Sequence, residues 1–176
     1  ARIFKTKQLH YWDRNAPYPN QSVQNIRWSE AKKIVLESYE KFDKRISDVV
    51  ELFFRNSWIH AEVLNGKTSG AFAHPTVPSV HPYILLNYQS KVRDVMTLSH
   101  ELGHGVHQYL ANNNGLLLSS TPLTLAETAS VFGEMLTFRS ILSGTKSNEQ
   151  RKVVLRSKIE DMLNTVVRQI SFYEFE

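Results

Sequence analysis

A His-Glu-x-x-His pattern in the segment TLSHELGHGVHQYL, residues 97–110, is the strongest candidate for chemistry in this sequence. On an α-helix each residue turns by about 100°, so His104 and His107 lie within roughly 40° of His100, on one narrow face. Two imidazoles at positions i and i+4 can converge on one metal ion, and the carboxylate of Glu101 can act as a base beside them. The spacing therefore predicts a metal site with a base next to it.

The opposite face of the same helix is apolar. It lies at roughly 160–240° from His100 and carries five residues with large side chains: Val95, Leu98, Leu102, Val106 and Tyr109. The alternative is a surface helix that is rich in histidine by chance. The opposed apolar face favours a helix that packs on a core and turns its histidines to a cavity.

A catalytic zinc ion takes three protein ligands and leaves one position for water, so a third ligand is needed. His107 lies almost two turns, roughly 10 Å, along the helix from His100, too far for both to bind one ion. We expect His107 to line the cavity or to form a hydrogen bond nearby. In zincins with a third histidine that residue would stand at position 110, which is Leu110 here. The chain has no cysteine, which excludes a thiolate ligand.

Glu127 is the best candidate for the third ligand. The segment PLTLAETASVFGEMLTF, residues 122–138, has only two charged residues, Glu127 and Glu134, so we expect a largely buried helix. A buried carboxylate is costly unless it is paired or binds a metal. Glu127 follows His104 by enough residues for a connector and a reversal, whereas Glu134 suits a supporting role on the free ring N–H of a histidine. The alternative is that the two glutamates pair with arginines: Arg93, Arg139 or Arg168.

Hydrophobic periodicity and turn residues predict the elements that position these groups. We expect helices capped by Ser29, by Asp43, and by Ser147 in a capping box with Gln150, and a turn at Asn65-Gly66. The expected order along the chain is an irregular arm at 1–28, two scaffold helices at 29–55, a hairpin and a strand at 58–88, the two metal-site helices at 91–142, and a last helix at 147–170. The sequence thus predicts one domain over residues 1–176, mainly α with a small β-sheet beside the metal helix.

The composition narrows the class of protein. A chain of 176 residues with 41% hydrophobic residues can form one real core. The net charge of +4 comes from mixed charges without a basic block, so nothing indicates a nucleic acid or a membrane surface as partner. No apolar run approaches the ~20 residues that span a bilayer. The absence of cysteine fits a reducing compartment. The chain starts without Met and ends inside a structured segment, which indicates a fragment of a longer protein.

Four segments, in this order, resemble the oligoendopeptidase F branch of the thimet-oligopeptidase family of zinc peptidases: GKTSGAFAH, HPYILLNY, DVMTLSHELGHGVH and PLTLAETASVFGEMLTF. The resemblance implies a zincin-like core with one Zn²⁺ per chain. It implies that His100, His104 and Glu127 bind the zinc and that Glu101 is the general base. In the first segment, three residues are expected to bind substrate: Gly70, Ala71 and Phe72.

The family is cytoplasmic and hydrolyses internal bonds of short oligopeptides with zinc-activated water, so the resemblance implies the same here. The family's catalytic region continues past position 176 with a Gly-rich segment of His and Tyr residues that stabilises the oxyanion. This chain therefore resembles a fragment of the catalytic domain. The alternatives are a non-catalytic fragment that binds zinc and peptide, and a helical interaction module without metal. Oligomeric state does not follow from the sequence.

Overall fold

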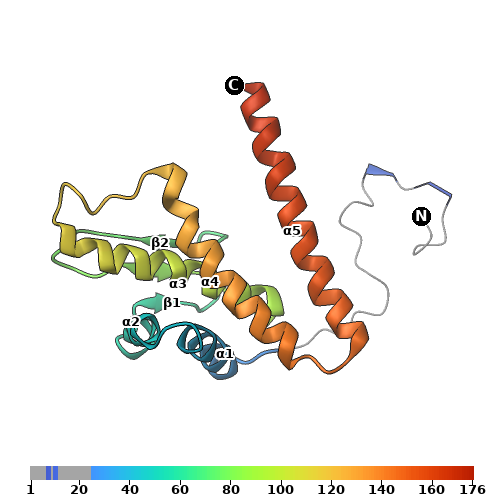
Figure 1. Cartoon of the computed structure of the whole chain (residues 1–176), viewed down its shortest axis with the longest axis horizontal. Helices are drawn as coiled ribbons and strands as arrows, with labels where there is room; N and C mark the ends of the chain where they lie inside the picture. Colours follow the sequence, from blue (N-terminus) through green and yellow to red (C-terminus); the bar gives the residue numbers. More distant parts are fainter. Residues whose placement is uncertain (1–6, 9, 12–24) are drawn as a thin grey trace. The chain divides into compact units, whose positions relative to one another are not determined.

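The computed structural model describes residues 7–8, 10–11 and 25–176 (Figure 1). The chain divides into two compact units, a larger one over residues 24–143 and a smaller one that includes residues 144–176. Most of the predicted irregular arm, residues 1–28, lies outside the described residues. The expectation of one domain over the whole chain stays a prediction.

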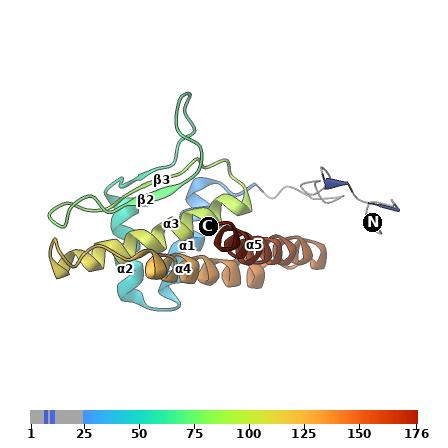
Figure 2. The same cartoon turned by 90° about the horizontal axis from the view of Figure 1, so that it is seen from above.

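The larger unit combines helices with a small sheet, so the predicted fold class, mainly α with a few strands, is confirmed. Figure 2 shows α3 between the sheet on one side and α4 on the other. The helices are α1 (Trp28–Glu40), α2 (Lys44–Arg55), α3 (Val92–Ala111) and α4 (Leu123–Gly144), with a 3₁₀ turn, η2 (Asn112–Asn114), after α3. The strands are β1 (Ile59–His60), β2 (Phe72–His74) and β3 (Tyr83–Leu85).

The sheet differs from the predicted hairpin. A turn does form at Asn65-Gly66, where Gly66 has φ +80°. However, β1 and β2 do not pair with each other, because β3 lies between them, parallel to β1 and antiparallel to β2. The physical reason is burial: Ile84 of β3 is 1% exposed, and this most apolar strand takes the central position.

Helix α3 forms the centre of the core, as its apolar face predicts. Val95, Leu98 and Leu102 are each 0% exposed. Close packing on this helix extends to Gly105, where an added Cβ would lie 2.8 Å from the ring of Phe53 on α2. The helix begins at Val92, within one residue of the predicted start at residue 91. Its fixed position between sheet and helices makes it a rigid support for the histidines.

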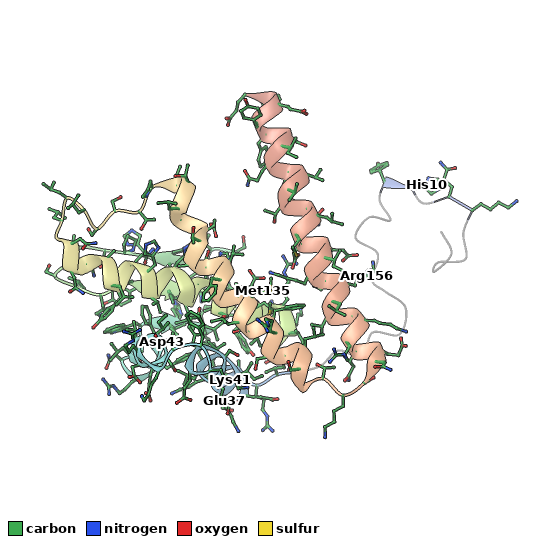
Figure 3. All side chains as sticks on the ribbon, in the orientation of Figure 1. His10, Glu37, Lys41, Asp43, Met135 and Arg156 are labelled. Atoms are coloured by element: carbon green, nitrogen blue, oxygen red, sulfur yellow. The ribbon has the colours of Figure 1, made fainter. Side chains whose placement is uncertain are left out.

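The predicted helix caps are only partly correct. Asp43, in the turn between α1 and α2 (Figure 3), accepts a hydrogen bond from the backbone N–H of Arg45, as expected. Ser29 does not cap α1, because the helix begins one residue earlier at Trp28, whose ring packs edge-on against Phe54 and Tyr88. Ser147 precedes the last helix without a side-chain cap, since solvent can satisfy the N–H groups of its exposed first turn.

The smaller unit contains α5 (Asn148–Phe175), which continues five residues beyond the predicted end at residue 170. Apolar side chains such as Leu163, Val166 and Ile170 are more than half exposed along it. None of the helices in the described residues is long and apolar enough to cross a bilayer.

Candidate metal centre

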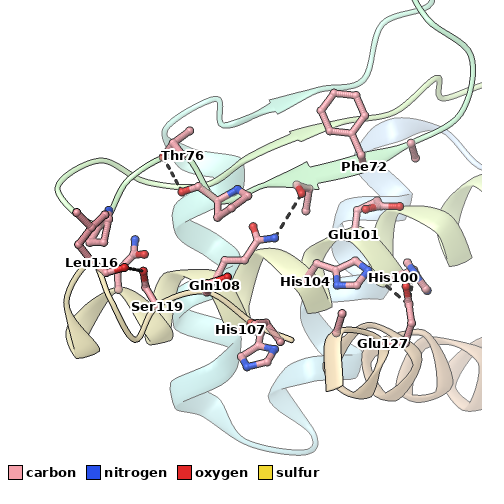
Figure 4. Close-up of a pocket in the computed structure, with 18 residues that line it drawn as sticks. Phe72, Thr76, His100, Glu101, His104, His107, Gln108, Leu116, Ser119 and Glu127 are labelled. Carbon is pink, nitrogen blue, oxygen red and sulfur yellow. Dashed lines mark hydrogen bonds and ion pairs between the residues drawn. The ribbon is translucent and has the colours of Figure 1, made fainter. Parts of the chain in front are cut away.

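Two of the three histidines of α3, His100 and His104, converge on one carboxylate oxygen of Glu127 on α4 (Figure 4). The Nε2 atom of His100 lies 3.2 Å from Oε2 of Glu127, and the Nε2 atom of His104 lies 3.5 Å from the same oxygen. All three potential ligand atoms lie within 4.8 Å of one another. The three residues that the sequence predicts as ligands therefore lie close together in the structure.

These separations fit a zinc ion. Bonds of about 2.0–2.1 Å in a tetrahedral arrangement place neighbouring ligand atoms roughly 3.3 Å apart. The two measured separations from Glu127 lie on either side of that value. Two histidines and one glutamate also form a ligand set that catalytic zinc sites use. The separation between the two histidine nitrogens lies within the 4.8 Å that bounds all three ligand atoms, so side-chain adjustment would bring the set around one ion.

Glu134 holds the other nitrogen of the first histidine. Its Oε2 lies 3.2 Å from Nδ1 of His100, and its side chain is only 15% exposed. His100 is therefore oriented from both sides of its ring, by Glu127 at Nε2 and by Glu134 at Nδ1. His107 lines the same cavity, and Figure 4 shows its ring pointing away from the three ligand groups.

The expectation that Glu127 is buried is wrong, because its side chain is 64% exposed. The first turns of α4 face solvent, as the 92% exposure of Leu123 shows. The side chain is held instead by Ser130, whose hydroxyl donates to Oε2 of Glu127 at 2.6 Å and to its backbone carbonyl at 3.1 Å. Ser130 is not among the site residues that the sequence predicts. Its spacing of three residues from Glu127, which places both on one helix face, is the signal that could have found it.

Two glycines let α3 and α4 approach closely. A Cβ on Gly103 would lie 2.5 Å from the carbonyl oxygen of Ala129, and a Cβ on Gly133 would lie 3.1 Å from the Ser99 carbonyl oxygen of α3 and would also overlap the hydroxyl of Tyr39 on α1. A buried polar network joins the same helices. The hydroxyl of Ser99 lies 2.8 Å from the Gly133 carbonyl and 2.7 Å from Oγ1 of Thr137. This contact surface sets how far the carboxylates of α4 stand from the histidines of α3.

Burial shapes the electrostatics of the catalytic candidates. Glu101 is 6% exposed, and this burial raises its pKa to about 7. The charge of His100 lowers that pKa and the nearby carboxylate of Glu127 raises it, but both effects are smaller than the effect of burial. Burial alone would lower the pKa of His100, but its hydrogen bond to Glu134 and three nearby carboxylates outweigh it and raise that pKa. Burial lowers the pKa of His104. The site thus holds a carboxyl group that can exchange a proton near neutral pH.

A cavity of about 600 Å³ opens beside these groups, between α3, β2 and the connector before α4. Ala71 and Phe72, two of the expected substrate-binding residues, line it. Gly70 is not among the described residues that line it, and its carbonyl accepts a hydrogen bond from Asn87. The predicted role of all three in substrate binding stays a prediction.

Strand β2 presents a free edge to this cavity. The N–H of Ile84 on β3 donates to the backbone carbonyl of Trp58, on the β1 side of β3. Ala73 and Ile84 therefore form a non-hydrogen-bonded antiparallel pair, and the backbone N–H and C=O of Ala73 point away from β3. In the part of the chain that the structure describes, no strand pairs with that edge. The carbonyl of Ala73 there accepts a long hydrogen bond, 3.3 Å, from Gln108 of α3.

Comparison with known proteins adds an independent line of evidence. The sequence profile of peptidase family M3 matches residues 18–176. The chain is 27% identical to oligopeptidase PepF of Bacillus subtilis over 176 residues, and 28% identical to an oligoendopeptidase F homolog of Borreliella burgdorferi over 178 residues. Each match covers 99% of this chain.

Solved structures agree with this result. A crystal structure of a proposed peptidase from Chlamydophila abortus matches 99% of this chain with a TM-score of 0.81 and 29% identity. A second structure, PZ peptidase A with an inhibitor, matches 80% with a TM-score of 0.69, and at 18% identity it supports the fold alone. The chain spans only 26–30% of the length of the first two relatives and 29% of the Chlamydophila chain.

Proposed function

Because this chain belongs to peptidase family M3, we propose that it forms the zinc-binding core of a peptidase that hydrolyses internal bonds of short oligopeptides. The resemblance to the oligoendopeptidase F branch that the sequence motifs indicated is confirmed by the relatives. The observation that carries the proposal is the convergence of His100, His104 and Glu127 on one point beside a cavity.

In this proposal His100, His104 and Glu127 hold one Zn²⁺, and Glu134 fixes the ring of His100 through Nδ1. When bound, zinc supplies a Lewis acid that lowers the pKa of a water molecule and polarises the scissile carbonyl. Neutral imidazoles and an ionised carboxylate are required for this role, and the hydrogen bond from His100 to Glu134 favours the tautomer with a free Nε2. His107 is proposed to line the substrate cavity rather than to bind the ion.

Glu101 is the proposed general base. Its carboxylate takes a proton from the attacking water and then gives it to the leaving amine. A base works best when its pKa lies near the working pH, and the burial that raises the pKa of Glu101 to about 7 supports this role. Its place next to His100 on α3 keeps it within the cavity wall.

The proposed substrate is an extended oligopeptide that adds a strand to the free edge of β2. Backbone N–H and C=O groups of Ala73 face that edge, and Ala71 and Phe72 continue the cavity wall towards Gly70. Binding through main-chain groups gives affinity with loose side-chain preference. A cytoplasmic location, where short peptides are degraded, is proposed with this function on the basis of the resemblance.

The alternative is a fragment that binds zinc and peptide without turnover. The chain spans less than a third of its relatives' length, so the activity of a whole peptidase is a proposal for it. A helical interaction module without metal is the other alternative, and it gives no reason for His100, His104 and Glu127 to converge. Zinc binding separates the module from the other two functions, and peptide turnover separates the enzyme from the binder.

The test is the zinc content and affinity of purified protein. We expect one zinc ion per chain, which is lost in His104→Ala and retained in His60→Ala, a matched change at an exposed histidine of β1. Zinc bound equally well by the His104→Ala variant would contradict the assigned ligands. Cleavage of a quenched fluorescent oligopeptide by the zinc-loaded protein then tests the enzyme against the binder.

A further inference from the structure

Glu127 reaches the two histidines from an exposed position, and the hydroxyl of Ser130 donates to its carboxylate from within α4. We propose that Ser130 is a positioning residue, which aims the carboxylate of Glu127 at the metal and thereby sets the affinity of the site. The inference rests on the proposed function, because it assumes that Glu127 is a zinc ligand.

The hydroxyl of Ser130 acts on the same oxygen that faces the histidines. It donates to Oε2 of Glu127 at 2.6 Å, while Nε2 of His100 lies 3.2 Å and Nε2 of His104 3.5 Å from that oxygen. A separation of about 2.5–2.7 Å is typical of a strong hydrogen bond from a hydroxyl to an ionised carboxylate. A carboxylate oxygen has two lone pairs, so one can accept from Ser130 while the other points at the ion.

Ser130 is itself held in place. It is 0% exposed, and the backbone at its Cα lies so near Gly103 that a Cβ there would come within 2.6 Å. The hydroxyl therefore stands on the rigid contact between α3 and α4, next to His104. Glu127, in contrast, has a long side chain that is 64% exposed, and little packing restricts its rotamers.

This difference explains why a hydroxyl matters here. Ordering an exposed glutamate side chain on a metal costs conformational entropy. Because Ser130 already holds the carboxylate towards His100 and His104, part of this entropy is lost in the metal-free protein, and less is lost when the ion binds. Groups that orient metal ligands typically change metal affinity by roughly 10- to 100-fold when they are removed.

The chain offers a matched control on the same helix. Ser143, also on α4, donates to the backbone carbonyl of Arg139 at 2.7 Å, which resembles the second bond that Ser130 makes to the Glu127 carbonyl. Ser143→Ala therefore removes a hydroxyl and a helix back-bond far along α4 from Glu127. Alanine adds no atoms and is the best helix former, so both variants are expected to fold, which far-UV circular dichroism of the metal-free proteins checks.

The experiment is a zinc titration against a chromophoric chelator for the wild type, Ser130→Ala, Ser143→Ala, Glu127→Ala and the double variant Ser130→Ala/Glu127→Ala. We expect Ser130→Ala to weaken zinc binding by about tenfold or more, and Ser143→Ala to leave it unchanged. In the Glu127→Ala background the Ser130 substitution should change affinity less than twofold, because its target is gone. A purely structural role of Ser130 would instead give the same loss in both backgrounds.

Two results would overturn the inference alone: wild-type affinity in Ser130→Ala, or an effect that persists without Glu127. If the wild type binds no zinc, or if Glu127→Ala binds it as well as the wild type, the proposed ligand set fails first and the role of Ser130 falls with it. The wild-type and Glu127→Ala titrations therefore distinguish failure of the proposed function from failure of the inference.

Discussion

Glu134 contacts His100 at the ring nitrogen that faces away from Glu127, with its Oε2 3.2 Å from Nδ1. A hydrogen on Nδ1 satisfies this carboxylate and leaves the lone pair of Nε2 free. The lone pair then points to the side where His104 and Glu127 converge. A hydrogen bond of this kind fixes both the tautomer and the orientation of a metal-binding histidine.

Removal of this contact should weaken the metal site. We expect Glu134→Ala to lower zinc affinity by roughly 10- to 100-fold while the protein stays folded. Glu37→Ala, which removes an exposed glutamate that pairs with Lys33 on α1, serves as the control and should change nothing. The measurement is a competitive zinc titration of both variants, and equal affinities would show that Glu134 does not support the site.

Glu101→Gln should separate catalysis from metal binding. The amide cannot accept the proton of the attacking water, and general base catalysis typically contributes about 10²–10⁴ in rate. We therefore expect a zinc content equal to that of the wild type and a loss of kcat/KM of that order on a quenched fluorescent oligopeptide. If zinc disappears together with activity, Glu101 is a ligand or a structural residue rather than the base.

Zinc affinity should fall as the pH is lowered, and His100 should set where the fall begins. A ligand imidazole must be neutral, so a proton on it competes with the metal. The pKa of His100 is raised above its ordinary value of 6.5, so this competition begins above pH 6.5, whereas His104, with a lowered pKa, competes only further down. Titrations between about pH 5 and 8 measure the onset.

The Glu134→Ala variant tests the cause of that onset. Loss of its hydrogen bond to Nδ1 should move the fall in affinity to lower pH, in addition to the general loss of affinity. An onset at the same pH in the wild type and the variant would show that other charges hold the proton on His100.

Gly103→Ala should destabilise the fold although alanine favours helices. The new Cβ would meet the backbone of Ala129 and Ser130 at 2.5 and 2.6 Å, and backbone atoms cannot move aside as a side chain can. We expect a loss of about 1–3 kcal/mol in the free energy of unfolding of the metal-free protein, with weaker zinc binding. Gly144→Ala, where a Cβ meets nothing within 4 Å, is the control. Urea unfolding that gives equal stability for the two variants would contradict the close helix contact.

The sequence predicted α3 and its two faces because helical periodicity is a local property. The spacing of His100 and His104 follows from the helix alone, and the scarcity of charged residues in 122–138 pointed to Glu127. The reason given for Glu127, its burial, was wrong, because the exposure of α4 depends on which elements cover it rather than on its own composition. Nothing local indicated that β3 would separate β1 from β2, since strands of two or three residues take their partners from tertiary packing.

Local sequence patterns do not predict the contact between Gly103 and Ser130 either. It depends on how two helices cross, and the residues involved lie 27 positions apart in the chain. Small residues at a crossing look like ordinary helix interior in the sequence. Only the crossing shows that they determine the distance between ligands.

The proposed ligands come from two helices that are separated by a connector, and this has a topological consequence. An ion held by His104 and Glu127 acts as a cross-link that closes a loop over residues 104–127. Unlike a disulfide, such a link is lost when the chain unfolds, so it stabilises this unit through the free energy of metal binding to the folded state, in a chain that has no cysteine. The metal would then link the exposed first turns of α4 to the buried helix α3 and stabilise this unit.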